Sequence, residues 1–209
     1  LQLDEEKWPA RQAASFINGN KEEGRRAKHI QHNGDLFTAT QLRIYGAYEE
    51  ICQRSGMIDF AEILLRSHEL WLNHPELLKH YQMRFRMILV DEFQDTNKIQ
   101  YAWLRMLAGE HGMLTAVGDD DQSIYGWRGA CIENIRTFQR DYADAELIRL
   151  EQNYRSTSAI LQAANAVIAN NGDRLGKNLW TERPNGDPIR VYAAFNDLDE
   201  AHYIARTLD

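Results

Sequence analysis

The stretch MILVDEFQDT, residues 87–96, sets two adjacent carboxylates directly behind a short apolar run. A run of this kind is typical of a buried strand, and open α/β sheets bind ligands beyond the C-terminal ends of their strands. The stretch therefore predicts that Asp91 and Glu92 lie at a ligand-binding edge of a sheet. In nucleotide hydrolases the first such carboxylate holds Mg²⁺, usually through water, and the second polarises the attacking water. An acidic helix cap after a buried strand is the alternative interpretation, and this short pattern alone does not separate the two.

The residues that follow alternate between strand-like and helix-like patterns. Apolar runs of strand length lie at 86–90, 113–117 and 146–150, and helix-like stretches lie at 97–108, 131–141 and 156–170. A further strand is predicted at 189–194, with a helix that begins at Asp197. Such alternation favours the α/β class, in which a largely parallel sheet is covered by helices.

Residues 1–84, in contrast, have a mostly helical pattern. Asp35 is placed to cap a helix that runs to about Ser55, and Gly56 is a typical helix stop. Also predicted here are a helix in whose first turn Pro9 lies, a loop over 18–28, a helix opened by Asp59 that runs through Trp71, and another that starts at Pro75. Three apolar residues of the helix opened by Asp59 are expected to pack against other elements: Phe60, Leu64 and Leu65.

The composition limits the class of protein. The 209 residues carry a net charge of −7, which is not the charge of a bulk electrostatic DNA binder, although an acidic protein can bind single strands through a local groove and aromatic stacking. No apolar run approaches the roughly 20 residues of a membrane helix, and the polar, acidic start at Leu1 predicts no signal peptide. Cys52 and Cys131 lack CxxC spacing and fit a reducing compartment, which favours a cytoplasmic protein.

Two further stretches of sequence are as distinctive as the first block, residues 87–96. They are VGDDDQSIYGWRGA at residues 117–130 and RLEQNYRS at residues 149–156. In this order and near these spacings, the three blocks resemble three consecutive motifs of superfamily 1A DNA helicases, in the UvrD/Rep/PcrA group. The resemblance covers nearly the whole chain, and blocks this long are rarely matched by chance.

The resemblance implies a fold and a division into domains. The fold would be part of a RecA-like P-loop NTPase motor, a parallel sheet with flanking helices, preceded by a mostly helical insert. Residues 1–84 would form the helical insert of the first motor domain, 85–150 the C-terminal half of that domain, and 151–209 the start of the second motor domain. No stretch has the form GxxxxGK(S/T), so the chain is expected to be an internal fragment that does not hydrolyse ATP alone.

The resemblance also implies a site for ATP and Mg²⁺. Asp91 would help to hold Mg²⁺, through water, and Glu92 would be the catalytic base, with Gln94 and Asp95 orienting the site. Gln122 would sense the γ-phosphate, because a neutral amide can accept from water and donate to a phosphate oxygen at once. The alternatives are a simple helix cap for Asp95 and a polar loop residue for Gln122.

The third block supplies two more residues of this site by resemblance. Tyr154 would stack near the adenine, and Arg155 would reach the γ-phosphate from the second motor domain. A guanidinium in that position stabilises the charge of the transition state, as arginine fingers do. The alternative for Arg155 is a surface residue that precedes a helix cap at Ser156.

The second block suggests contact with nucleic acid. Tyr125 and Trp127 flank Gly126, and stacking of a base on an aromatic ring contributes about 1–3 kcal/mol. By resemblance this loop would form part of a track for single-stranded DNA, with Trp127 stacking on a base. Arg128 would contact a phosphate or pair locally. The alternative is that both aromatic residues fill a domain core, which is the commoner fate of large aromatic residues.

The function implied for the intact protein is that of an ATP-dependent helicase and single-strand translocase. It would move 3′ to 5′ and act in DNA repair and replication, with single-stranded and duplex DNA and DNA-repair proteins as partners. One alternative is the motor portion of a helicase–nuclease, and another is a non-catalytic module that binds DNA or protein. The sequence leaves the oligomeric state open.

Overall fold

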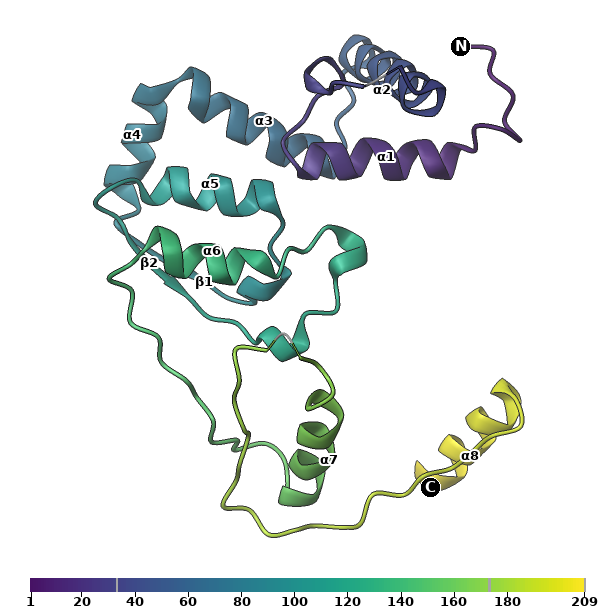
Figure 1. Ribbon diagram of the computed structural model, residues 1–209, viewed down its shortest axis with the longest axis vertical. Helices are drawn as coiled ribbons and strands as arrows, with labels where there is room; N and C mark the ends of the chain where they lie inside the picture. The colour runs from purple at the N-terminus through teal and green to yellow at the C-terminus, as the bar shows by residue number, and fades with distance from the viewer. Residues whose placement is uncertain (33, 173, 209) are drawn as a thin grey trace. The chain divides into compact units, whose positions relative to one another are not determined.

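In the computed structural model, which describes residues 1–32, 34–172 and 174–208, the chain divides into two units, 1–145 and 146–209. Their α-helices and strands are labelled in Figure 1. The helices of the first unit are α1 (Ala10–Glu22), α2 (Leu36–Ser55), α3 (Phe60–Asn73), α4 (Pro75–Arg84), α5 (Lys98–Ala108) and α6 (Glu133–Asp141). Its strands are β1 (Met87–Val90) and β2 (Met113–Ala116), and its short 3₁₀ helices are η1 (Ala27–His29), η2 (Phe93–Asp95), η3 (Asp120–Gln122) and η4 (Gly126–Arg128). The second unit contains α7 (Ser158–Ile168) and α8 (Asp197–Leu208).

The capping signals of the first unit are confirmed. The Asp35 carboxylate accepts from the backbone N–H groups of Phe37 and Thr38, so it satisfies donors that the start of α2 leaves unpaired. Gly56 ends the same helix in the left-handed conformation, with φ of 64°. Asp59 caps α3 by accepting from the N–H of Glu62 at 2.7 Å.

The loop predicted over 18–28 is wrong in its first part, because α1 continues to Glu22. The Asn20 side chain donates to the Phe16 carbonyl at 2.8 Å, one turn back, and so remains compatible with the helix. Lys21 is only 2% exposed and pairs with Asp59, the cap of α3, and with Glu62 in the first turn of that helix. These tertiary contacts favour the helical conformation of a stretch whose composition is typical of a turn.

The strands β1 and β2 pair in parallel, as the alternation of patterns predicted. Met87 is opposite Met113, and Val90 is opposite Ala116. The sheet is not buried on both faces, however, since Leu89 is 75% exposed. The residues that the structure describes thus form a mixed, mainly helical structure with a small two-stranded parallel sheet.

Two of the predicted strands are wrong. The stretches 146–150 and 189–194 carry no strand in the structure, and Ile148 and Val191 are 69% and 92% exposed. An apolar run becomes a strand only where a neighbour pairs with its backbone, and neither stretch has one among the described residues.

The core of the first unit forms around Phe93, which is 3% exposed. Its ring meets those of Tyr101 in α5 and Phe138 in α6 edge to face, so both helices pack against the turn that follows β1. A second contact stacks Trp71 of α3 on Trp103 of α5 with centroids 4.2 Å apart. Leu65 is buried as expected, but Phe60 is 93% exposed and does not pack as predicted.

Several contacts join segments of the second unit. An isolated parallel bridge joins Gln152 to Trp180, and the Asn165 side chain of α7 donates to the Leu179 carbonyl at 2.9 Å. Near α8, Tyr192 stacks on Tyr203 with centroids 3.9 Å apart.

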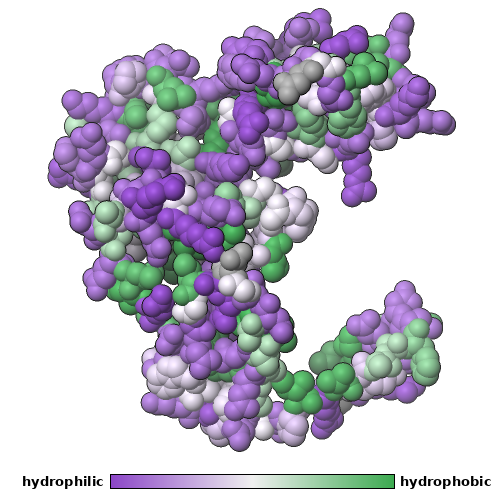
Figure 2. Space-filling view, in the orientation of Figure 1, coloured by the Kyte–Doolittle hydropathy of each residue, from purple (hydrophilic) through white to green (hydrophobic). Residues whose placement is uncertain are grey.

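Hydrophilic residues cover most of the surface visible in Figure 2, with apolar ones in separate groups. None of the helices among residues 1–32, 34–172 and 174–208 is long and apolar enough to cross a membrane.

Candidate active site

The turn after β1 carries the two predicted carboxylates, Asp91 and Glu92, both exposed. Glu92 has φ of 50° and ψ of 43°, a left-handed conformation that costs a residue with a side chain on the order of 1–3 kcal/mol. Its N–H donates to Asp91 Oδ1 at 2.9 Å, and the next N–H, of Phe93, donates to the Val117 carbonyl at 2.9 Å. Bonds on both sides of Glu92 therefore hold the strained turn, and strain of this kind concentrates at functional sites.

Gln94 links this turn to the second block of sequence. It is only 1% exposed, and its Nε2 donates to Glu92 Oε2 at 2.7 Å. Its Oε1 accepts from the N–H of Asp119 at 2.9 Å. Gly118 makes this approach possible, because a Cβ there would lie 2.7 Å from Gln94 Oε1. The amide thus orients the Glu92 carboxylate and ties it to the loop that begins at Gly118.

Gln122 extends the same set of hydrogen bonds. Its Nε2 donates to Asp119 Oδ2 at 2.6 Å, and Asp119 Oδ1 accepts from the N–H of Asp121 at 3.0 Å. Three predicted positions, Asp91, Glu92 and Gln122, are therefore joined by one series of hydrogen bonds, which passes through Gln94 and Asp119. Gln122 itself is exposed.

The oxygen atoms near this turn are suitable ligands for a hard cation such as Mg²⁺. Asp91 and Glu92 offer carboxylate oxygens, which are the ligands that Mg²⁺ prefers. Asp95, in the 3₁₀ turn that follows, has a buried Oδ1 without a hydrogen-bond partner among the described residues. Asp95 is not the cap of the next helix, since Asn97 caps α5 in a reciprocal capping box with Gln100. The alternative interpretation of Asp95 as a helix cap is thus excluded.

Three further carboxylates, those of Asp119, Asp120 and Asp121, lie within 4.8 Å of one another. Asp119 caps η3 and also accepts from Gln122, so this group has a structural use in the loop.

The aromatic loop presents its rings to solvent. Trp127 is 76% exposed and Tyr125 is 36% exposed, so neither ring fills a core. The Arg128 guanidinium lies 5.2 Å from the Tyr125 ring centroid and 4.7 Å from that of Trp127. Arg128 thus has the local pairing that was one of its two expected roles, through cation–π contacts. An exposed indole on a loop joined to a carboxylate turn is well placed for stacking on a base.

The far end of this loop is fastened by a residue that the sequence did not single out, Asn134. It is 4% exposed, in the first turn of α6. Its Nδ2 lies 3.0 Å from the Thr96 carbonyl, 3.1 Å from Thr96 Oγ1 and 3.2 Å from the Asn97 carbonyl. Asparagine competes with the backbone in helices, so its presence as the fourth residue of the helix-like stretch 131–141 was the signal available.

The two predicted residues of the third block belong to the second unit. Tyr154 is 73% exposed and donates from its hydroxyl to Gln152 Oε1 at 2.8 Å. Arg155 is exposed, and its N–H donates to Asn153 Oδ1 at 2.9 Å. Ser156 is not the helix cap, because α7 begins after Thr157.

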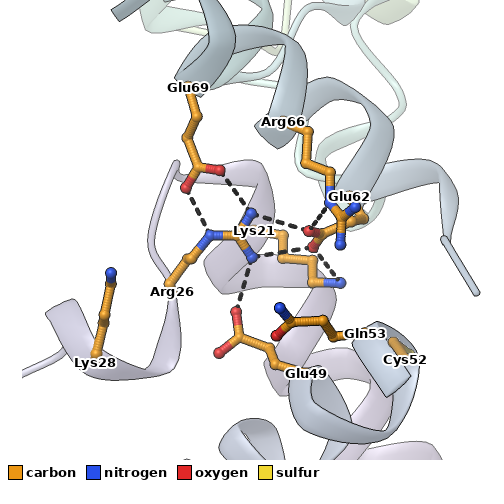
Figure 3. Close-up of a pocket in the computed structure, with 9 residues that line it drawn as sticks. All are labelled: Lys21, Arg26, Lys28, Glu49, Cys52, Gln53, Glu62, Arg66 and Glu69. Carbon is orange, nitrogen blue, oxygen red and sulfur yellow. Dashed lines mark hydrogen bonds and ion pairs between the residues drawn. The ribbon is translucent and has the colours of Figure 1, made fainter. Parts of the chain in front are cut away.

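A polar pocket lies elsewhere in the first unit, among α1, α2 and α3 (Figure 3). Arg26 pairs with Glu49, Glu62 and Glu69, and Lys21 pairs with Glu62. Burial alone would raise the pKa of Glu62, but hydrogen bonds from Arg26, Arg66 and Lys21 outweigh burial and lower it to about 2. These charges satisfy one another, so the pocket serves to join the helices.

Comparisons with known proteins concern the whole chain. Residues 1–143 match the model of the UvrD/REP helicase N-terminal domain, and residues 148–209 match that of the UvrD-like helicase C-terminal domain. DNA helicase II of Escherichia coli (strain K12) is 60% identical over 208 residues, which are 100% of this chain and 29% of the relative. The ATP-dependent DNA helicase PcrA of Staphylococcus aureus (strain Mu50) is 42% identical over 207 residues, 99% of this chain and 28% of the relative. The chain thus spans less than a third of the length of these relatives.

Proposed function

Since the chain belongs to the UvrD/REP helicase family, we propose that it is a portion of an ATP-dependent DNA helicase that translocates 3′ to 5′ on single-stranded DNA in repair and replication. The proposal covers single-stranded and duplex DNA as substrates and DNA-repair proteins as partners in the cytoplasm. Relatives of the chain are named as DNA helicase II and as an ATP-dependent DNA helicase, which supports both the nucleotide and the DNA.

The domain assignment is part of the proposal. Residues 1–84 are the helical insert of a first RecA-like motor domain, 85–150 are the C-terminal half of that domain, and 151–209 begin a second one. The parallel pairing of β1 with β2 and the acidic turn at the end of β1 support this assignment.

Within the nucleotide site, the proposed roles follow from the chemistry of each side chain. The Asp91 carboxylate would help to hold Mg²⁺, through water, and the ion would supply neutralisation of the phosphate charge. Glu92 accepts a proton from the attacking water, and Gln94 fixes the direction in which its carboxylate points.

The remaining residues of the nucleotide site respond to the ligand. The exposed amide of Gln122 reports the γ-phosphate to the loop. From the second motor domain, Tyr154 stacks near the adenine and Arg155 stabilises the charge that develops at the γ-phosphate.

The DNA contact is proposed at Tyr125, Trp127 and Arg128. The single observation that carries the function is the hydrogen-bonded path from Glu92 through Gln94 to Asp119, at the start of the loop that exposes Trp127. A carboxylate that activates water and a ring that stacks on bases are thereby parts of one connected segment, as a motor requires.

The test is ATP hydrolysis by the complete protein that contains this chain, with and without single-stranded DNA, beside Glu92→Gln. We expect strong stimulation by DNA in the unchanged protein and a loss of about 10²–10⁴-fold in the variant, the range of general-base catalysis. Stimulation that survives Glu92→Gln would move the water-activating role elsewhere. Binding of DNA without any stimulated hydrolysis would favour a non-catalytic binding module instead.

A further inference from the structure

The aromatic loop is attached to the acidic turn at both of its ends. At the entry, Gln94 Oε1 accepts from the N–H of Asp119, and the Val117 carbonyl accepts from Phe93. At the exit, the Thr96 carbonyl accepts from the N–H of Cys131 at 2.9 Å. Residues 118–130 are therefore hydrogen-bonded to the 92–97 segment at both ends, so the loop begins and ends beside the acidic turn.

Asn134 is the main side-chain fastening of the exit. It is 4% exposed, and its single amide nitrogen lies within hydrogen-bond distance of three oxygens of residues 96 and 97. Thr96 Oγ1 in turn donates to the Phe93 carbonyl at 2.7 Å, inside the same turn as Glu92. Side-chain contacts therefore run from α6 back to the carboxylate turn, independently of those made by Gln94.

A buried amide that meets three acceptors does more than fill space. An apolar residue would serve a purely packing role but would make no hydrogen bond to residues 96 and 97, whose carbonyls also accept from the N–H groups of Cys131 and Tyr101. Asn134 thus restricts where the loop can end relative to Thr96. A loop that is held at both ends transmits a displacement of its middle to the acidic turn, whereas a loop that is held at one end would absorb it.

We propose that Asn134 is a positioning residue that couples DNA contact at Trp127 to water activation at Glu92. The inference rests on the proposed function and adds to it the residue that holds the exit of the loop. Movement of the indole on a base pulls on the exit, and the Asn134 contacts pass that pull to Thr96 and the turn that sets Glu92. Gln94 performs the corresponding task at the entry.

The experiment measures DNA stimulation of ATP hydrolysis by the complete protein at saturating single-stranded DNA, so that a change in DNA affinity does not affect the result. The stimulation factor is expected to fall at least tenfold in Asn134→Ala. The matched control is Gln82→Ala, which removes an amide that donates to the Met106 carbonyl at 2.7 Å and joins α4 to α5 in the same unit. The control is expected to keep the stimulation factor of the unchanged protein within twofold.

A second variant covers the case in which Asn134→Ala does not fold. Thr96→Val keeps the shape and both backbone acceptors but removes the hydroxyl that joins Asn134 to Phe93. It is expected to lower the stimulation factor in the same direction by a smaller amount.

The outcomes separate the inference from the proposed function. Stimulation unchanged in Asn134→Ala and Thr96→Val, or reduced equally in Gln82→Ala, overturns the positioning role while the motor function stands. An unchanged protein that shows no stimulation overturns the motor function itself.

Discussion

At the scale of single residues, the backbone of Glu92 is the most unusual feature. A residue with a side chain holds a positive φ, and three neighbours compensate for the cost: Asp91, Gln94 and Val117. The Gln94 amide accepts on one side and donates on the other, a dual use that a carboxylate or a hydrocarbon of the same length cannot make. The site therefore requires an amide at Gln94, which is almost wholly buried.

Trp127 gives the first prediction at this scale. Because its ring is 76% exposed beside Arg128, Trp127→Ala is expected to weaken binding of single-stranded DNA by about 1–3 kcal/mol, the contribution of one stacked base. Fluorescence anisotropy of a labelled oligonucleotide, with the complete protein and no nucleotide, measures the change. Trp8→Ala, which removes a ring stacked on Phe37 in the same unit, is the control and should leave the affinity unchanged. Equal loss in both variants would contradict a base-stacking role for Trp127.

At the scale of elements, α2 offers a comparison of a glycine inside a helix with the glycine that ends it. Gly56 ends α2 with φ of 64°, whereas Gly46 lies in the helix interior with nothing within 4 Å of an added Cβ. Gly56→Ala is expected to lower the free energy of unfolding by about 1 kcal/mol, since alanine is strained at positive φ. Gly46→Ala is expected to raise it by about 0.5–1 kcal/mol through helix propensity. Urea denaturation measures both, and shifts of the same sign would contradict the assigned end of α2.

At the scale of the whole molecule, the ion pairs that join α1, η1, α2 and α3 make stability depend on pH. The pKa of Glu62 falls from 4.5 to about 2 on folding. A carboxylate with a lowered pKa in the folded state stabilises that state above its unfolded pKa, and the contribution is lost as the pH falls. The stability of the first unit is therefore expected to decline between about pH 5 and pH 2.

The variant Glu62→Gln tests the origin of this decline. The variant removes one anionic partner from Lys21 and from Arg26. Lys21 keeps Asp59, and Arg26 keeps Glu49 and Glu69. The free energy of unfolding is expected to fall by on the order of 3 kcal/mol at pH 7. Its urea midpoint should vary less with pH between 5 and 2 than that of the unchanged protein. An equally steep pH dependence in the variant would assign the effect to other carboxylates.

A second prediction at this scale concerns the 209-residue chain by itself. Its sequence contains no GxxxxGK(S/T) loop to hold the phosphates, so we expect no ATP hydrolysis above background. A phosphate-release assay with Mg²⁺ and single-stranded DNA measures this. Mg²⁺-dependent turnover that disappears in Glu92→Gln would show that the chain suffices without that loop.

What the sequence determined is local in origin. Caps at Asp35 and Asp59, the stop at Gly56 and the parallel pair of strands were all predictable, because short-range hydrogen bonds and the alternation of patterns decide them. The acidic turn and the exposed aromatic pair were found for the same reason, since each lies within one continuous block.

Only the tertiary structure decided which residues meet across distance. The last turn of α1 is helical because Lys21 pairs with Asp59 and Glu62. The run at 146–150 is no strand because no segment of the described residues pairs with its backbone. Asn134 reaches Thr96 across 38 positions, and no local pattern encodes that meeting. Such contacts depend on the simultaneous placement of several elements, and the free energy that selects them comes from packing and buried hydrogen bonds rather than from the propensity of any one segment.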